Sequence, residues 1–526
     1  MQEVTQEFFD TTEAGLRKIS SKIYISFKKD YDASIDFFEV GTSLIGGTDL
    51  LKGTQDVVQE WDKFDYEDFS DRIISINYNR EVDQPTSSIT VAQAQFVLNN
   101  SDGLFTPSNS SSSLGDFILP RRPVKVLMGF NDELLQVFVG LTVGLPVVDE
   151  KSKTATFNCV DFMTSFINKP LDEAVIYEDL RSDEIIQNLL EDHAGLLSSQ
   201  FDLDTGTITI PFAYFPKGTT IKDGIDKVVS ADLGNFFVDE NGVTRFQNRV
   251  NWLSNTKVWD FSTNTVLDIR TPGEERIINV AEVFSNVRAV QSNQKIWELE
   301  SAIEVPAGDS VDIFANFSDN DGDIPTTAVD DPVYIDSKTT SLYATNEKLD
   351  GSGAPKNGDI SLDDTTLFST SFKMEFSNSG AASVFITQIE LFGTPAKVIK
   401  HIYIREQNDA SIGTSDGFDE KLFRIDNDFI QDDANAESIA LTIINDRGDF
   451  DDQREIIVMA VPQLQIGDVV NYTDKEINED YYVTRINGTL TAKGGFTQLV
   501  ELTQRTIESY FIIGVSTIEG GDKIGP

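Results

Sequence analysis

The chain has 526 residues, of which 40% are hydrophobic and 25% are charged, a composition typical of a globular protein. This length predicts roughly three or four domains. The 87 acidic and 42 basic residues give a net charge of −45, which argues against a protein held on nucleic acid by phosphate contacts. The same charge serves solubility, or a surface past which DNA slides without ionic trapping.

The covalent and targeting features exclude several further classes. Cys159 is the only cysteine, so no intramolecular disulfide can form. It alternates with apolar residues in "TATFNCVDF", which predicts a buried core thiol rather than a nucleophile. The N-terminal "MQEVTQEFFD" has no apolar core of a secretory signal, and no apolar run approaches the ~18 residues of a membrane span.

Residues 1–71 are interpreted as an N-terminal extension in which "TTEAGLRKISSKIYISF" carries a short helix and then a strand. A β unit follows at 72–169. In "RIISINYNREV", Ile74, Ile76 and Tyr78 share one face, and "ITVAQAQFVLNN" alternates in the same way. Period-2 alternation with Gly and Pro punctuation predicts antiparallel strands with one buried face. Five such strands indicate a small barrel or sandwich.

Residues 170–255 change to a helical period and are expected to form an α+β module. The first predicted helix, "LRSDEIIQNLLEDHAGLL", has Ser182 as its cap. The second, "TTIKDGIDKVVSADLG", begins at Thr220 and ends at Gly234. The pair Asn241-Gly242 predicts a hairpin with a type I′ turn.

The remainder is expected to be β. Residues 256–299 and 396–510 form a second β unit, in which "SIALTIIN" is interpreted as a strand. Residues 300–395 form a separate, inserted β domain, and 511–526 a frayed tail.

The sequence offers few residues that could form a catalytic site. His193 and His401 are far apart and each lies beside apolar residues, so both are interpreted as structural, and no nucleophile–base pair or zinc set is predicted. Paired carboxylates could cleave glycosides, but among 87 acids the sequence singles out no pair. No cofactor cradle is found.

One acidic run resembles the start of a calcium loop. "SDNDGDIP" places Asp319, Asp321 and Asp323 at alternate positions. An EF-hand needs glycine at its sixth position, where this chain has Ile324. A tight turn with solvated carboxylates is the first interpretation, and a weak calcium site is the alternative.

A serine-rich loop lies between two predicted strands, in "FVLNNSDGLFTPSNSSSSLGDFILPRRPVKVLMGF". It lacks a catalytic base and a phosphate cradle, so an assembly loop that protrudes from the β unit is favoured over an enzyme lid. Arg121 and Arg122 close the loop. They are candidate contacts to an acidic neighbour, with solvated loop arginines as the alternative.

Several of these stretches together resemble a known family. "FVLNNSDGLFTP", "LPRRPVKVLMGF" and "LQVFVGLTVGLP" resemble the N-terminal barrel of tail hub and minor tail proteins of long-tailed phages. "AVPQLQIGDVVNY", "YYVTRINGTL" and "FTQLVELTQR" resemble the second barrel of such hubs. The likeness covers 72–300 and 396–506. It has no counterpart for the first 70 residues, and 300–395 stands as an insertion.

The resemblance implies a mainly β fold with a small α+β module, two tail-tube-like β-barrels and an inserted β-sandwich. It implies a homotrimer whose six barrels form a pseudo-hexameric ring between the hexameric tail tube and the threefold tail tip, with DNA passing through an acidic lumen. Implied partners are the tail tube or distal tail protein, tip or fibre proteins and the tape measure protein.

The expected location is the tail tip of a virion made in the host cytoplasm, without enzymatic activity or cofactor. Two rival functions remain open. One is a receptor- or glycan-binding tail protein acting through 300–395, and the other is a tail-associated cell-wall hydrolase.

Overall fold

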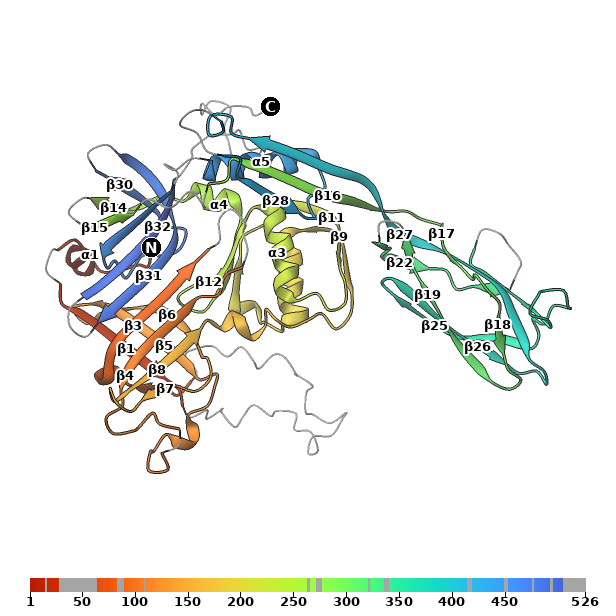
Figure 1. The fold of residues 1–526 in the computed structure, drawn as a ribbon, viewed down its shortest axis with the longest axis horizontal. Coiled ribbons are helices and arrows are strands. Elements are labelled where there is room, and N and C mark those ends of the chain that lie inside the picture. The colour runs from red at the N-terminus through yellow and green to blue at the C-terminus, as the bar shows by residue number, and fades with distance from the viewer. Residues whose placement is uncertain are drawn as a thin grey trace.

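The computed structural model has three parts: a large twisted β-sheet, an α+β module packed beside it, and a distal lobe carried on a long ribbon (Figure 1). It describes residues 1–504 apart from 15–16, 28–63, 83–88, 108, 263–264, 271–276, 320–321, 335–339, 414–418, 449–452, 475–476 and 492–494. Among the helices in these ranges, none combines the length and apolar character that a membrane crossing requires.

The first half of the large sheet contains the strands predicted from period-2 alternation. Its order is β3-β4-β8-β6-β5-β1-β2, with β7 paired to β8, and every pairing is antiparallel. Ile76, Tyr78 and Phe96 are buried in its core as the alternation predicts. Ile74, which the alternation assigns to the same face, is 37% exposed, because the register of β3 on β4 shifts between Ile73 and Ser75. The strands are β1 (Ile19–Ile25), β2 (Glu67–Asp68), β3 (Ile73–Glu81), β4 (Gln93–Asn99), β5 (Pro123–Phe130), β6 (Glu133–Thr142), β7 (Val147–Asp149) and β8 (Thr154–Val160).

The N-terminal segment belongs to this half. The expected short helix and strand are present as α1 (Gln6–Glu13) and β1. β1 pairs with β5 from Ile19↔Phe130 to Ile25↔Val124. The boundary expected at residue 71 is therefore not a boundary of the sheet, because β1 supplies backbone hydrogen bonds and buried side chains to the same unit.

The second half contains six strands and is joined to the first without a break. β3 pairs with β31 from Ser75↔Thr491 to Glu81↔Arg485, so the two halves form one 14-stranded sheet. No closed barrel is formed by the strands in the described ranges. The strands are β14 (Lys257–Ser262), β15 (Val266–Arg270), β29 (Gln453–Met459), β30 (Val469–Thr473), β31 (Asn478–Thr491) and β32 (Gly495–Gln504).

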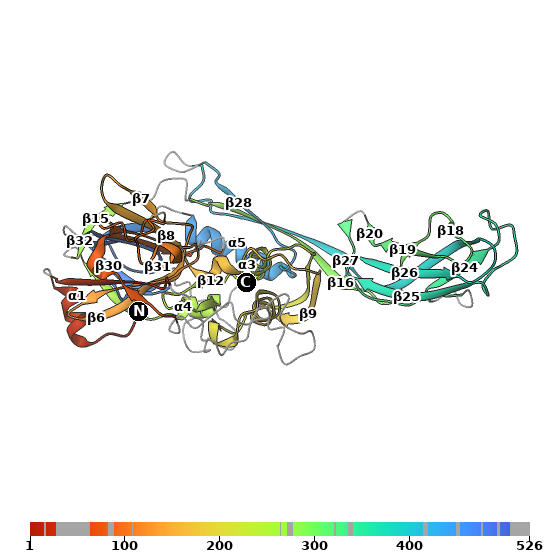
Figure 2. The same ribbon diagram turned by 90° about the horizontal axis from the view of Figure 1, so that it is seen from below.

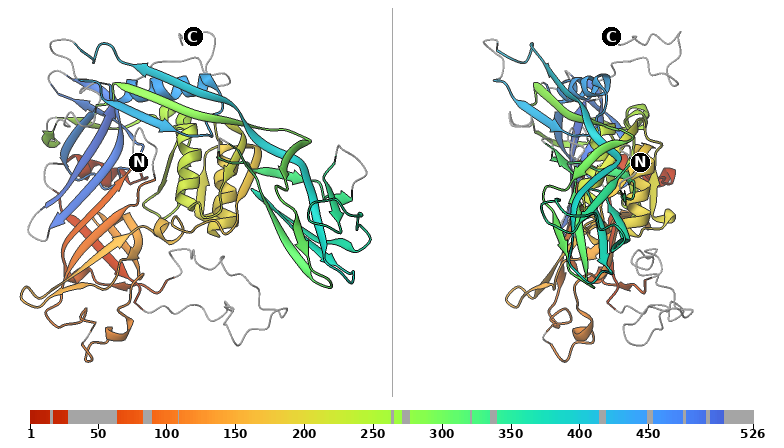
Figure 3. Two further views of the ribbon diagram at one scale, coloured as in Figure 1. Left: turned by 45° about the vertical axis from the view of Figure 1, so that its right-hand side comes forward. Right: turned by 90° about the vertical axis from the view of Figure 1, so that its right-hand side faces the viewer.

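The α+β module lies between the large sheet and the ribbon (Figure 3). Its helices pack their buried faces into a second apolar core, which α5 and the ribbon share. The elements are β9 (Val175–Arg181), α2 (Ser182–Asn188), the π-helical η5 (Leu189–Ala194), β10 (Phe201–Leu203), β11 (Thr209–Phe215), α3 (Ile221–Asp232), β12 (Asn235–Val238), β13 (Thr244–Gln247) and α4 (Arg249–Ser254).

Of the three helix ends predicted for the module, one is confirmed and two are corrected. Thr220 caps α3, and its hydroxyl accepts from the Asp223 amide at 3.1 Å. The cap of α2 is Arg181, while Ser182 is the first helical residue. α3 ends through Leu233 in the left-handed region (φ 54°) rather than through Gly234. Gly234 is needed for space instead, since a Cβ there would lie 2.5 Å from the Phe246 ring.

The type I′ turn predicted at Asn241-Gly242 is wrong. β12 and β13 do form a hairpin, but only Gly242 of the Asn241-Gly242 pair has positive φ (82°). A type I′ turn needs positive φ at both central residues. That condition is met at Asn131 and Asp132 (φ 48° and 69°), which join β5 to β6.

The stretch "SIALTIIN", predicted as a strand, lies in α5 (Asp433–Arg447). Ile439, Ala440, Ile443 and Ile444 are fully or almost fully buried at helical spacing. The Asp432 carboxylate accepts from the Asn435 amide at 2.7 Å and caps the helix. Tertiary burial therefore overrides the weak helix propensity of a β-branched run.

A long two-stranded ribbon connects the body to the distal lobe (Figure 2). β16 (Val280–Val290) pairs with β27 (Val384–Gln407) from Val280↔Gln407 to Val290↔Ala396. β28 (Leu422–Asp426) pairs in parallel with β16. The sequence grouped 256–299 and 396–510 in one β unit, whereas the pairing places 280–290 and 396–407 in this ribbon and outside the large sheet.

The distal lobe, residues 291–395, has an apolar core of its own. The N-terminal part of β27 pairs with four of its strands, and β19, β26 and β25 form a second ladder. The lobe strands are β17 (Gln294–Glu298), β18 (Ile303–Val305), β19 (Ser310–Asn316), β20 (Ser318–Asp319), β21 (Gly322–Asp323), β22 (Thr326–Val329), β23 (Val333–Tyr334), β24 (Leu342–Asn346), β25 (Ile360–Phe368) and β26 (Ser371–Asn378).

Candidate functional site

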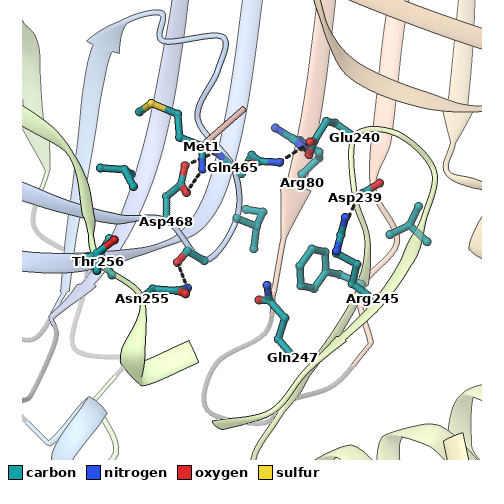
Figure 4. Close-up of a pocket in the computed structure, with 16 residues that line it drawn as sticks. Met1, Arg80, Asp239, Glu240, Arg245, Gln247, Asn255, Thr256, Gln465 and Asp468 are labelled. Atoms are coloured by element: carbon teal, nitrogen blue, oxygen red, sulfur yellow. Dashed lines mark hydrogen bonds and ion pairs between the residues drawn. The ribbon is translucent and has the colours of Figure 1, made fainter. Parts of the chain in front are cut away.

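A polar cavity of about 350 Å³ lies where the N-terminus, the β12–β13 hairpin and the turn before β30 meet (Figure 4). Both halves of the large sheet and the α+β module contribute to its wall. We call this region the junction. Its charged groups are Met1, Arg80, Asp239, Glu240, Arg245 and Asp468.

The strongest contact of the junction is a buried ion pair. Arg80 Nη1 donates to Glu240 Oε2 at 2.7 Å, and the side chains are 5% and 2% exposed. A second guanidinium nitrogen of Arg80 donates to the Leu464 carbonyl at 3.2 Å. Glu240 also accepts from the Gln465 side chain, and its backbone carbonyl accepts from Gln136 Nε2 at 2.8 Å. One carboxylate thus connects the first half, the second half and the module.

The chain's N-terminal amine forms the second contact. It donates to the Asp468 carboxylate in a partly buried ion pair. Asp468 also accepts from the Gln465 amide at 2.7 Å. Burial raises the pKa of the Asp468 carboxyl, and the Met1 ammonium opposes that rise.

The third contact shapes the hairpin loop that carries Glu240. Asp239 accepts from Arg245 Nε at 2.8 Å and from the amides of Asn241 and Val243, each at 2.9 Å. Burial, followed by the neighbouring Glu240 charge, raises the pKa of the Asp239 carboxyl. The junction pairs its charges with one another, which suits it to fixing the relative position of three units.

Arg80 and Glu240 are absent from the sequence predictions, although a signal for Arg80 exists. Ile76 and Tyr78 were assigned to the buried face of β3, and Arg80 continues that face at the same period. An arginine at a core position of a strand indicates a buried partner. Nothing local to Glu240 or Asp468 distinguishes them among the 87 acidic residues.

The serine-rich loop is compact. Phe105, Leu114 and Ile118 insert into the core of the large sheet. Asn100 Oδ1 accepts from the Phe105 amide at 2.8 Å, and Asn109 Nδ2 donates to the Gly103 carbonyl at 3.0 Å. The loop lies at the end of the first half, where it extends beyond the strands (Figure 1).

The two loop arginines have different surroundings. Arg122 is 8% exposed, and its Nε donates to the Phe117 carbonyl at 2.9 Å, so it holds the loop from inside. Burial lowers the pKa of its guanidinium. Arg121 is exposed and has a positive φ of 63°. Of the two predicted contacts, Arg121 is the one whose side chain reaches solvent.

The other predicted site residues do not come together. Asp319 and Asp323 lie on β20 and β21, which pair through Ser318↔Asp323 and Asp319↔Gly322; Asp321 lies outside the described residues. No group of three or more metal-ligating side chains forms in the described ranges. His193 lies on η5, and His401 lies on β27, where its Nδ1 is 2.8 Å from Asn286 Oδ1. Cys159 is buried, as predicted, and burial raises its thiol pKa.

A buried carboxyl lies at the end of β8, where the first half meets the module. Asp161 accepts from the amides of Ala92 and Met163 at 2.7 and 3.0 Å, and caps the short helix η4 (Phe162–Ser165). Burial raises its pKa from 3.8 to about 7. Between pH 3.8 and about 7, Asp161 is protonated in the folded chain and ionised in the unfolded chain. The stability that this bound proton contributes is present at low pH and is lost as pH rises through about 7.

The Asp161→Asn variant tests this proton. Its free energy of unfolding should fall less steeply than that of the wild type as pH rises from 5 to 7, with a slope difference of up to about 1.4 kcal/mol per pH unit. Urea denaturation at three pH values measures both slopes. Other buried acids titrate in both proteins, so equal slopes would contradict the assignment.

No protein-family model matches the chain, and no curated protein matches its sequence. Solved structures similar to it include the 43 kDa tail protein of prophage MuSo2 from Shewanella oneidensis (TM-score 0.44, 10% identity, 84% of this chain and 95% of that chain). A tail protein from Neisseria meningitidis has a TM-score of 0.44 at 8% identity, over 84% and 94% of the two chains.

Prophage tail protein gp18 from Listeria monocytogenes has a TM-score of 0.36 at 7% identity, over 85% of this chain and 93% of that chain. All three TM-scores are below 0.5. Two of these structures are prophage tail proteins, and the Neisseria structure is a tail protein.

Proposed function

We propose that the chain is a structural virion protein, a tail hub that assembles as a homotrimer. The observation that carries the proposal is the antiparallel β3–β31 ladder, which holds two β units side by side in one chain. Three copies arranged head to tail would place six such units around an axis. A ring of this kind matches a hexameric tail tube on one side and a threefold tip on the other.

The junction supports this role. A hub transmits force between a tube and a tip, so its two β units need a fixed relative position. The buried Arg80–Glu240 pair joins the first unit to the module. The Met1–Asp468 pair joins the first unit to the second. A buried pair favours one relative position, because a shift of one unit that leaves either charge buried without its partner is costly.

The charge of the chain supports passage of DNA through such a ring. A net charge of −45 repels phosphates, and acidic residues facing the lumen would prevent ionic trapping. The partners are the tail tube or distal tail protein above, tip or fibre proteins below, and the tape measure protein inside. Arg121 is the exposed candidate for contact with an acidic neighbour.

Native mass measurement tests the assembly. The purified chain, of 58.4 kDa, should give a species of three subunits. Arg121→Glu should lower the trimer fraction without changing the melting temperature, whereas Lys151→Glu on the exposed β7–β8 turn is the control. A wild-type chain that stays monomeric at high concentration, alone and with tail-tube protein, would contradict the proposal.

A second function has a separate observation in its favour. The distal lobe projects from the body on the β16–β27 ribbon and has its own core (Figure 2). Its β25–β26 turn meets the body, where Ser369 and Thr370 hydrogen-bond with Tyr214 of β11. An arm of this shape presents a binding surface to an external partner, which supports receptor binding through 300–395 as an additional role. The hydrolase alternative stays a prediction, because the sequence singles out no pair of carboxylates for it.

A further inference from the structure

The ladder β19–β26–β25 of the distal lobe turns one face to its apolar core and the other to solvent. We call the solvent-facing side the platform. Its residues follow from the strand register. Three of its cross-strand rows are Asp312–Glu375–Asp364, Phe314–Lys373–Thr366 and Asn316–Ser371–Phe368, and a fourth, Ser310–Ser377–Ser361, lies beyond the first.

Two aromatic rings are exposed on the platform. Phe314 and Phe368 are 54% and 48% exposed, whereas Phe317, Phe372 and Phe376 are buried in the core of the lobe. They lie two strands apart and two residues apart along the strands, which places their Cβ atoms roughly 12 Å from each other. Polar Lys373 and Ser371 separate them, so the rings form two apolar spots rather than one continuous apolar patch.

The first row is acidic. Asp312, Glu375 and Asp364 are neighbours across the three strands. Lys373 donates to Asp312 at 3.1 Å, and the hydrogen bond with Asp312 raises the pKa of the Lys373 ammonium. Three carboxylates against one ammonium leave the row negative, which repels a polyanion. The carboxylate oxygens can accept hydrogen bonds from the hydroxyl groups of a ligand.

The size of the platform limits its occupant. The three strands have 7, 8 and 9 residues, which gives an area on the order of 400 Å² at normal strand spacing. A stable protein interface needs about 800 Å² from each partner. The platform therefore suits a short, narrow ligand better than a folded protein.

We infer that the platform binds a neutral oligosaccharide. The C–H faces of pyranose rings stack on Phe314 and Phe368, because the face of an aromatic ring is negative and attracts C–H groups. Hydroxyl groups donate to the acidic row and exchange hydrogen bonds with Thr366, Asn316 and Ser371. This inference rests on the second proposed function, receptor binding by the lobe, and names the surface and the ligand class.

The test uses the full-length chain and five probes. Maltohexaose, cellohexaose, mannohexaose and chitohexaose are neutral, and poly(glycerol phosphate) is anionic. Ligand-observed NMR at millimolar sugar measures the Kd. At least one neutral probe should bind, and the F314A/F368A variant should raise its Kd by about tenfold or more. Leu349→Ala, which removes a 60% exposed side chain elsewhere on the lobe, should leave the Kd unchanged.

Three outcomes of the binding measurement would overturn the inference: no binding of a neutral probe, equal binding by F314A/F368A, or tighter binding of the anionic polymer. Native mass measurement of F314A/F368A separates the two proposals. A variant that still forms a trimer but no longer binds sugar supports sugar binding by the platform. Adsorption to host cells that survives periodate oxidation of their glycans would retain receptor binding while refuting a sugar ligand.

Discussion

Replacing Arg80 with methionine should lower the free energy of unfolding by roughly 3–5 kcal/mol. Methionine approximates the length and apolar stem of arginine, so the packing change is small. The Glu240 carboxylate, only 2% exposed, then loses its charged partner. A buried charge without a partner is far more costly than an absent ion pair, which is why one substitution has so large an effect.

Urea denaturation followed by tryptophan fluorescence measures this loss. Trp252 and Trp259 lie in the core beside the junction, so their emission reports its opening. Lys257→Ala breaks the Lys257–Asp260 pair, whose side chains are 45% and 65% exposed, and should cost under about 1 kcal/mol. An Arg80→Met effect as small as this control would contradict the role of the junction.

A second variant separates the ion pair from packing. The double variant R80M/E240Q removes both charges and keeps a side-chain oxygen that accepts from Gln465. It should recover at least about 1 kcal/mol relative to R80M alone. No recovery would mean that arginine packing, rather than the uncompensated carboxylate, accounts for the loss.

Excising the distal lobe should abolish sugar binding and leave the body folded. Val290 and Ala396 are direct partners in the ribbon, so residues 291–395 can be replaced by Asn-Gly, which closes a two-residue hairpin. The lobe core shares no residue with the two cores of the body. We therefore expect the melting temperature of the body to stay within a few degrees of the full-length value.

The excised chain should assemble with the same number of subunits as the full-length chain and should no longer adsorb to host cells. Circular dichroism and native mass measurement check the body, and a cell-binding assay checks the loss. A matched control carries the same Asn-Gly inserted between Val290 and Gln291 with the lobe retained. Unchanged adsorption by the excised chain would place the receptor contact in the body.

Local patterns predicted most strands because alternation reports burial directly. The runs around Ile76 and Phe96 form β3 and β4, and their apolar faces lie in the core. The run in α5 was misjudged because β-branched isoleucines favour strands locally, whereas packing on β16 and β27 decides the helix. Propensity acts over a few residues, but burial is set by the whole chain.

The junction could not be predicted for a related reason. Arg80 and Glu240 are 160 positions apart, and Met1 and Asp468 are 467 positions apart. Such pairs arise from the fold, and no local spacing encodes them. Arg122 shows the same limit, since its charge indicated a surface contact while the fold turned its side chain inward to Phe117.

The ratio of this chain to the tail-tube protein in purified particles tests the central claim most directly. Quantitative mass spectrometry of particles carrying this chain would count both proteins, with the number of tube rings taken from electron micrographs of the same sample. We predict three copies of this chain for each six tube subunits of a single ring. Absence from the particle, or six copies per particle, would contradict a trimeric tail hub.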